Sequence, residues 1–455
     1  MTSVDKPTAP APEPVSADQS DADVPIVTSE PPEGGVGPYF RNYVNRVRGG
    51  EMGSLPAGIG LVVLVLFFWF AQPNFHTLFN FGNMFTEGTA TIFIAMGLVF
   101  ALLLGEIDLA AGYAGGVSAA VMVRLTLGYG APWPLSIGAA LVTGLIIGLL
   151  TGWLRAKVRI PSFIVTLAFF LAFQGVMQWI VQNGPGAHGD LPMTDSVQLA
   201  FANSQMPLWA GWALGGVVVF GYAFIKLTTI RDRLRRGLTA EPWLVAGVKI
   251  LTLAVVTFGL IYLLSLNRAL NQGGGSFKNI NGKIVAVETP AVAGVPWVVP
   301  VLLVLLVIWS FLLSRTRYGR HVYAVGGNEE AARRAGIPVD RIRMSVFVLC
   351  SFMAAIGGIM LASNVSSVSV KDYGGNVLLL AVGAAVVGGT SLFGGKGRMI
   401  DALIGGAVIE VIYNGMATLV HGPNSSAFQY IATGLALLLA AAADAITRRR
   451  TDASA

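Results

Sequence analysis

From Leu55 onward, the sequence alternates long apolar stretches with short polar breaks. A helix that crosses a bilayer needs about 20 mostly apolar residues. The stretches lack the ten-residue alternation of membrane β-barrels, so helix is the expected conformation. Twelve stretches qualify, near residues 55–72, 86–104, 107–127, 134–154, 161–182, 207–226, 243–266, 296–314, 344–362, 377–394, 399–419 and 428–446. The sequence therefore predicts an all-α protein, a polytopic transmembrane helical bundle with about 12 spans (10–12).

The composition excludes a water-soluble enzyme of this length. Of 455 residues, 54% are hydrophobic and only 12% are charged, whereas soluble domains carry about 25% charged residues. So few charges cannot cover the outside of a soluble globule. The single cysteine, Cys350, excludes an intrachain disulfide, and the four histidines show no metal-ligand spacing. We therefore expect no metal site.

Positive charges divide unequally between alternate breaks. Loops on the cytoplasmic side of a membrane protein carry an excess of Lys and Arg. If the N-terminus is cytoplasmic, only four of the 30 Lys and Arg residues fall in outward-facing breaks: Arg268, Lys278, Lys283 and Lys371. If one span in the middle of the chain were wrongly assigned, the later breaks would change sides, and Lys and Arg would no longer gather on the cytoplasmic side. The charge pattern therefore predicts twelve spans with both ends of the chain in the cytoplasm.

The chain divides into three regions. Residues 1–54 are rich in Pro, Ala, Asp and Glu, which predicts a disordered cytoplasmic tail. No charged segment followed by an apolar stretch opens the chain, so we expect no cleaved signal peptide. We expect residues 55–450 to form the transmembrane domain and residues 451–455 to form a short C-terminal tail.

The weakest predicted span is 107–127. It follows Gly105 and Glu106 directly and contains Arg124. Two interpretations remain, a full span or a re-entrant element, and the second would lower the count to eleven.

The largest cytoplasmic break, residues 315–343, carries the signals of a short helix. Asn328 is a suitable N-cap, good helix formers follow it, and Gly336 and Pro338 end the segment. A helix of two turns is marginal in isolation, so it needs something packed against it. These residues alone leave two interpretations, a solvated basic loop or a docking helix for a cytoplasmic partner.

Glycines mark two further features. Residues 383–398 look like a phosphate-binding loop but fail its pattern. Thr390 stands where the first Gly belongs, and Gly397 stands where Ser or Thr must hold magnesium. Close packing or a helix break is the favoured interpretation. A smooth packing ridge is also predicted where glycine recurs every four residues, at Gly144, Gly148 and Gly152.

Few polar residues lie within the apolar stretches, and each costs free energy unless it is paired or hydrated. They can line a path for a neutral polyhydroxylated solute, or they can simply hydrogen-bond neighbouring helices. A proton relay would need several acidic residues at mid-depth, and only Glu410 fits that description. The candidate substrate-pathway residues are Glu106, Asp108, Gln174, Trp179, Tyr413 and Asn414.

Taken as a whole, the sequence resembles a known family, the permease subunits of bacterial monosaccharide ABC importers. Five segments carry the resemblance, in family order, over most of residues 55–450. RDRLRRGL (231–238) and the apolar stretch after it make the chain most similar to the D-xylose type among the ribose, xylose and arabinose translocators. The five segments are GEIDLAAG (105–112), RIPSFIVTLAFFLAFQG (159–175), YAVGGNEEAARRAGIPVDRIR (323–343), GGTSLFGGKG (388–397) and FQYIATGLALLLAAAAD (428–444).

The resemblance implies a transport subunit of the bacterial inner membrane that is not itself an enzyme. It implies a permease homodimer, an extracytoplasmic sugar-binding protein, and a cytoplasmic ATPase that binds ATP and Mg. This chain then needs no cofactor, and no nucleic acid is involved. The outer loop 267–296 is longer than the resemblance leads us to expect. The ATPase-coupling residues implied are Glu329, Glu330, Ala331, Ala332, Arg333 and Gly336.

The function predicted is import of a monosaccharide, D-xylose or a similar pentose, by alternating access around a polar cavity. The alternative is a secondary sugar transporter that runs on an ion gradient. That alternative predicts a cation role for Glu410 and no dependence on a separate ATPase.

Overall fold

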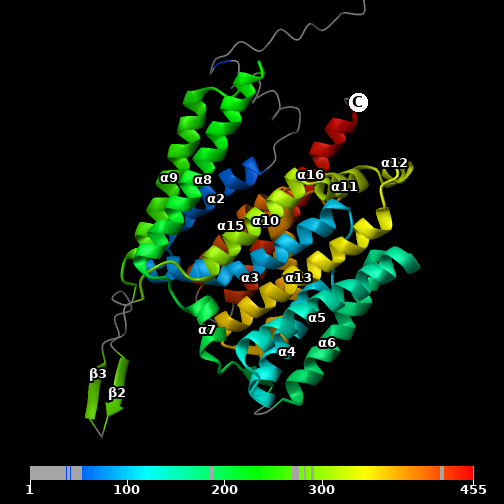
Figure 1. Cartoon of the computed structure of the whole chain (residues 1–455). Coiled ribbons are helices and arrows are strands. Elements are labelled where there is room, and N and C mark those ends of the chain that lie inside the picture. The colour runs from blue at the N-terminus through cyan, green and yellow to red at the C-terminus, as the bar shows by residue number, and fades with distance from the viewer. Residues whose placement is uncertain are drawn as a thin grey trace, which may run out of the picture.

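The computed structural model describes Gly37, Arg41 and residues 54–184, 189–238, 240–268, 276–280, 283–287, 292–420 and 425–453. The predicted tail, residues 1–54, lies outside the described residues apart from three positions. The long helices run through one bundle (Figure 1). Their bounds are α2 (Leu55–Ala71), α3 (Leu78–Leu103), α4 (Ala111–Tyr129), α5 (Trp133–Trp153), α6 (Ser162–Gln182), α8 (Leu208–Arg235), α9 (Trp243–Ser265), α10 (Val298–Arg315), α13 (Val339–Val365), α14 (Gly375–Val387), α15 (Met399–Leu419) and α16 (Ser425–Ala453).

Short elements connect these helices. A π-helical turn, η1 (Leu154–Val158), ends α5, and a 3-10 turn, η3 (Val370–Asp372), precedes α14. The short helices are α7 (Ser196–Asn203), α11 (Arg317–Gly327) and α12 (Glu329–Arg334). Strand β1 (Asp190–Pro192) pairs antiparallel with β4 (Ser367–Ser369), and β2 (Ser276–Ile280) pairs antiparallel with β3 (Lys283–Val287). The β2–β3 hairpin and α7 lie at the end of the bundle opposite to α12 and the end of α16 (Figure 1).

The helical class is confirmed, but not the number of spans. Ten helices among the described residues are long and apolar enough to cross a membrane. Of the other two predicted stretches, α2 is apolar but has 17 residues, and α4 is one continuous helix of 19 residues. Twelve spans, and the cytoplasmic position of both chain ends, remain predictions.

The predicted ends of two helices, α14 and α16, differ from the observed ends. The stretch 377–394 extends too far, because α14 ends at Val387 and the glycines that follow take positive φ values, starting with Gly389 at +117°. Such backbone angles end a helix. The helix break predicted for this glycine-rich segment is therefore confirmed. At the other end of the chain, α16 continues to Ala453, into the predicted C-terminal tail.

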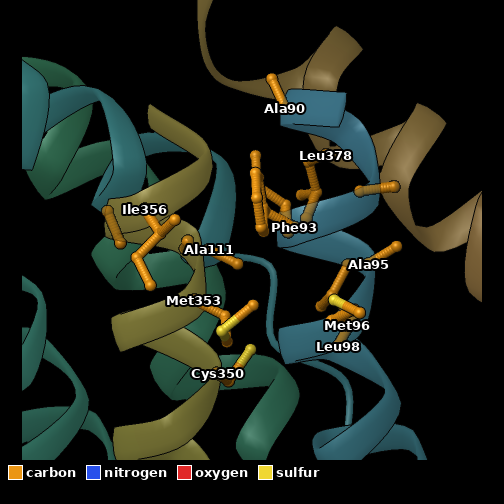
Figure 2. Packing of buried hydrophobic residues seen from close by; sticks show 14 of the residues in the cluster. Ala90, Phe93, Ala95, Met96, Leu98, Ala111, Cys350, Met353, Ile356 and Leu378 are labelled. Atoms are coloured by element: carbon orange, nitrogen blue, oxygen red, sulfur yellow. The ribbon is translucent and has the colours of Figure 1, made fainter. Parts of the chain in front are cut away.

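The core lies between α3 and α13. Every residue from 92 to 103 of α3 is buried, and so is most of the inward face of α13. Figure 2 shows this packing, with Phe93 and Met96 of α3 near Met353 and Ile356 of α13. By contrast, α8 and α9 pair with each other at the edge of the bundle and bury little of their surface (Figure 1). Packing density is thus concentrated around α3.

The predicted glycine ridge is confirmed as the contact between α5 and α13. A Cβ at Gly148 would lie 2.6 Å from the Cα of Val348 and 2.7 Å from the Phe347 carbonyl oxygen. A Cβ at Gly144 or Gly152 would likewise approach backbone carbonyls of α13 within 2.9 Å and 2.8 Å. Glycine at each position lets the two backbones approach this closely.

This packing gives the first prediction. Gly148→Val should lower the unfolding temperature of the detergent-solubilised protein, because the backbone of α13 cannot move aside cheaply, and overpacking costs about 1–3 kcal/mol or more. Gly138→Val in the same helix is the matched control, because a Cβ there meets nothing within 4 Å. Equal unfolding temperatures for the two variants would contradict the proposed close contact.

Candidate functional site: a charged junction at one end of the bundle

The junction forms where the helical backbone stops between α3 and α4, at residues 104–110. Asp108 is fully buried there, and its Oδ1 accepts a hydrogen bond from the Ala110 N–H at 3.0 Å. The buried Cys350 of α13 interacts electrostatically with this carboxylate. A carboxylate that accepts a backbone N–H two residues ahead favours a turn. Asp108 therefore fixes the start of α4.

The glycine-rich segment 388–398 packs on this junction. The Gly395 N–H donates to the Leu103 carbonyl at the end of α3 at 2.9 Å. A Cβ at Gly394 would lie 2.9 Å from both the Gly105 nitrogen and the Gly326 carbonyl oxygen. Three backbone segments far apart in sequence meet here because glycine occupies the contact points. The glycines thus serve close packing rather than phosphate binding.

A chain of ion pairs crosses the same junction. Arg155 of η1 places its Nη2 2.7 Å from Glu106 Oε1, and Arg343 of α13 places its Nε 2.8 Å from the same oxygen. Arg343 Nη2 then lies 2.7 Å from Glu329 Oε2 in α12. Arg333 also binds Glu329, at 2.9 Å, one helical turn along. The predicted coupling segment and the buried Glu106 are therefore joined by direct contacts.

Helix α12 is built as the sequence indicates. Asn328 Oδ1 accepts the Ala331 N–H at 2.9 Å as N-cap, and Gly336 takes a φ of +79° just beyond the helix. The predicted single helix was nevertheless incomplete, because α11 occupies most of the remaining segment and ends at Gly327. Tyr323 of α11 donates its hydroxyl to the Gly397 carbonyl at 2.7 Å. The segment is a pair of helices fixed to the bundle, not a solvated loop.

The predicted coupling residues divide between two faces of α12. Ala332 is buried, and Glu329 pairs with Arg343, so both hold the helix to the bundle. Glu330 pairs only with Arg334 on the outer face, with side chains 66% and 79% exposed. Ala331, Arg333 and Gly336 are also exposed. The outer face is therefore charged and open to a partner.

The six candidate pathway residues do not come together. Gln174 and Trp179 lie on α6, which packs against α4 and α5, and Trp179 is 68% exposed. Tyr413 and Asn414 lie on α15, which packs against α2, α3, α14 and α16. Glu106, like Asp108, belongs to the junction. The candidates therefore form three separate groups, of which the α15 pair is one, and their role in a substrate pathway stays a prediction.

Other polar side chains surround that pair. Asn414 and Asn80 of α3 exchange two side-chain hydrogen bonds, at 2.7 and 2.9 Å. Tyr413 interacts electrostatically with Glu87, Glu410 and Tyr430. Amides, hydroxyls and carboxylates of this kind suit the hydroxyl groups of a sugar.

Sequence reasoning missed Arg155 and Arg343 as partners, because it counted them only as part of the basic excess. It also missed Asn80, which precedes the predicted start of that span at residue 86. Glu87 lies inside the predicted span, but it was not considered among the polar residues there. Within the described part of the chain, no three His, Cys, Asp or Glu residues gather as metal ligands.

These features define a class, a multi-pass helical membrane protein with an exposed, charged helix at one end. The family model described as "Branched-chain amino acid transport system / permease component" matches residues 80–441. The chain belongs to this family, the ABC-importer permeases of the bacterial inner membrane, and is a transport subunit without a catalytic or nucleotide-binding domain.

Individual relatives agree with this assignment. The xylose transport system permease protein XylH of Escherichia coli K12 is 33% identical over 397 residues, which cover 86% of this chain and 91% of that protein. XylH of Haemophilus influenzae is 31% identical, over 86% and 96% of the two chains. The ribose import permease protein RbsC of E. coli K12 is 28% identical, over 85% and 92%. No solved structure matches the chain.

The junction gives a prediction for acid pH. The hydrogen bond from Arg343 lowers the pKa of the Glu329 carboxyl below its ordinary value, and partial burial opposes this shift. A group with a lowered pKa stabilises the fold above its unfolded-state pKa, about 4.3, and this stabilisation is lost as the pH falls through the lowered value. Wild-type protein should therefore unfold at a higher temperature than Glu329→Gln at neutral pH, and the difference should shrink below about pH 4. A difference that does not change with pH would contradict the ion pair.

Proposed function

We propose that the chain is the membrane subunit of an ATP-driven pentose importer, with D-xylose as the first candidate substrate. Xylose and ribose, named for its relatives, are both aldopentoses. Two copies of the chain would form the pathway, and an extracytoplasmic binding protein would deliver the sugar. The bundle would alternate between outward-open and inward-open states.

The observation that carries this proposal is the construction of α12. The helix has six residues, too few to be stable alone, yet its inner face is fixed to the bundle through Ala332 and Glu329. Its outer face presents Glu330 and Arg334 to solvent. A rigid, exposed, charged helix at the end predicted to be cytoplasmic is a suitable docking element for an ATPase subunit. Movements of an ATPase bound to this helix would then reach the bundle through α12.

The pathway proposal rests on the polar face of α15. Tyr413 provides a ring for stacking on a sugar, and Asn414 is held by Asn80. Alternating access requires polar groups that can replace the water around sugar hydroxyls. This face supplies uncharged amides and hydroxyls together with Glu410. We therefore place the pathway beside α3 and α15 and no longer include Gln174 and Trp179.

Reversal of the outer-face charge tests docking. Glu330→Lys should abolish most co-purification of the cognate ATPase subunit from native membranes in mild detergent, because it places like charge beside Arg334 without touching the bundle. Membrane insertion and unfolding temperature should match the wild type. Arg233→Glu, an exposed charge reversal at the end of α8, is the matched control and should retain the ATPase. Full retention by Glu330→Lys would overturn docking on this face.

The substrate has a separate test. In a bacterial host that lacks its own pentose importers, expression of the chain with its cognate ATPase and binding protein should restore uptake of labelled D-xylose. Unlabelled D-xylose should compete better than D-ribose, and a hexose should compete weakly. Uptake that only a hexose inhibits would contradict the pentose assignment.

A further inference from the structure

Glu106 is a buried charge that the substrate proposal does not use. It is 4% exposed and lies in the non-helical segment between α3 and α4. Two guanidinium groups from different elements hold its carboxylate, with both Arg155 Nε hydrogen bonds at 3.0 Å in addition to the contacts already described. A carboxylate with this degree of burial persists only when it is paired.

The four residues form what we call the charge chain: Glu329, Arg343, Glu106 and Arg155. Two carboxylates alternate with two guanidinium groups, so the chain carries no net charge. Side-chain exposure falls from 43% for Glu329 to 8% for Arg343 and 5% for Glu106, and rises again to 20% for Arg155. The charge chain therefore runs from the surface of α12 beneath the end of the bundle to η1, with Glu106 as its most buried member.

The elements joined by the charge chain differ in backbone conformation. Residues 104–110 lie outside any helix, although the Glu106 N–H still donates to the Ala101 carbonyl of α3 at 3.1 Å. Arg155 sits in the π-helical turn at the end of α5, a conformation often found at functional sites. Arg343 lies on the long helix α13. A displacement of α12 thus acts on two segments that are not α-helical and on one long helix.

Separation of Glu329 from Arg343 is unfavourable, because the buried Arg343 would keep only Glu106, a carboxylate that it shares with Arg155. When α12 moves, Arg343 and Glu106 must follow it or exchange partners. Either response changes the position of the α3–α4 connection. That connection joins the most buried helix of the core to α4.

We propose that the charge chain transmits movement of α12 to the α3–α4 connection, and that Glu106 is a positioning residue for transport rather than a substrate ligand. This inference rests on the proposed function, because it assumes an ATPase that docks on α12. Docking and transmission are nevertheless separable. A variant can bind the ATPase fully and still fail to couple ATP hydrolysis to sugar transport.

The test is performed on the complete importer in liposomes, with ATP hydrolysis and D-xylose uptake measured together. Glu329→Gln and Glu106→Gln should retain the ATPase and hydrolyse ATP, but the sugar moved per ATP should fall about tenfold. Because both substitutions interrupt one chain, the double variant should lose no more than the worse single variant. A merely structural role would lower the yield of folded protein without changing this ratio.

The matched control is Asp340→Asn. It removes a more exposed ion pair of 3.8 Å between Lys157 and Asp340, which joins the same two elements, η1 and α13. This variant should keep the wild-type ratio of sugar to ATP. If Glu106→Gln fails to fold, Glu329→Gln alone tests the proposal, because the Glu329 side chain is half-exposed in the wild type.

Two results would overturn the transmission role. One is an unchanged ratio in Glu329→Gln, and the other is loss of the ATPase from that variant, which would make Glu329 a docking contact. Absence of the ATPase from the wild-type preparation would instead contradict the proposed function.

Discussion

The structure depends on how one buried carboxylate is paired at the end of a helical bundle. Glu106 can be buried only because Arg155 and Arg343 both reach it. This requirement fixes the end of α5 and the start of α13 against the connection between α3 and α4. The same Arg343 binds α12 through Glu329, so a short helix that is unstable alone gains a fixed position. The pairing of Glu106 therefore positions α5, α12 and α13 relative to the α3–α4 connection.

Glycine makes this arrangement possible. The end of α3, the end of α11 and the segment 388–398 converge beside the ion pairs, and a Cβ at Gly326 or Gly394 would collide with the backbone of another segment. Along α5, Gly148 permits the same close approach to α13. In a membrane, where lipid tails are as apolar as the helices, close backbone packing replaces much of the hydrophobic driving force. The core and the junction share this physical basis.

The sequence predicted the helical class, the glycine ridge, the N-cap Asn328 and the helix end at Gly336, because each depends on local spacing or conformation. It did not predict that Glu106 pairs with Arg343, since the partners are far apart in sequence and any cytoplasmic arginine fits the charge pattern equally well. The same limit applies to Asn80 and Asn414. Apolar periodicity also misplaced the start of α3, where polar residues interrupt the pattern. Local sequence patterns predict individual helices and their ends, whereas contacts between residues far apart in sequence are visible only in the structure.

On the proposed function, ATP hydrolysed by a partner subunit that acts on α12 supplies the free energy for transport. The most direct measurement is sugar uptake into liposomes that contain the purified chain with its ATPase and binding protein. We expect uptake that requires ATP on the side of the membrane where α12 lies and that persists when ion gradients are abolished. Uptake by the chain alone, driven by a proton or sodium gradient without ATP, would contradict it.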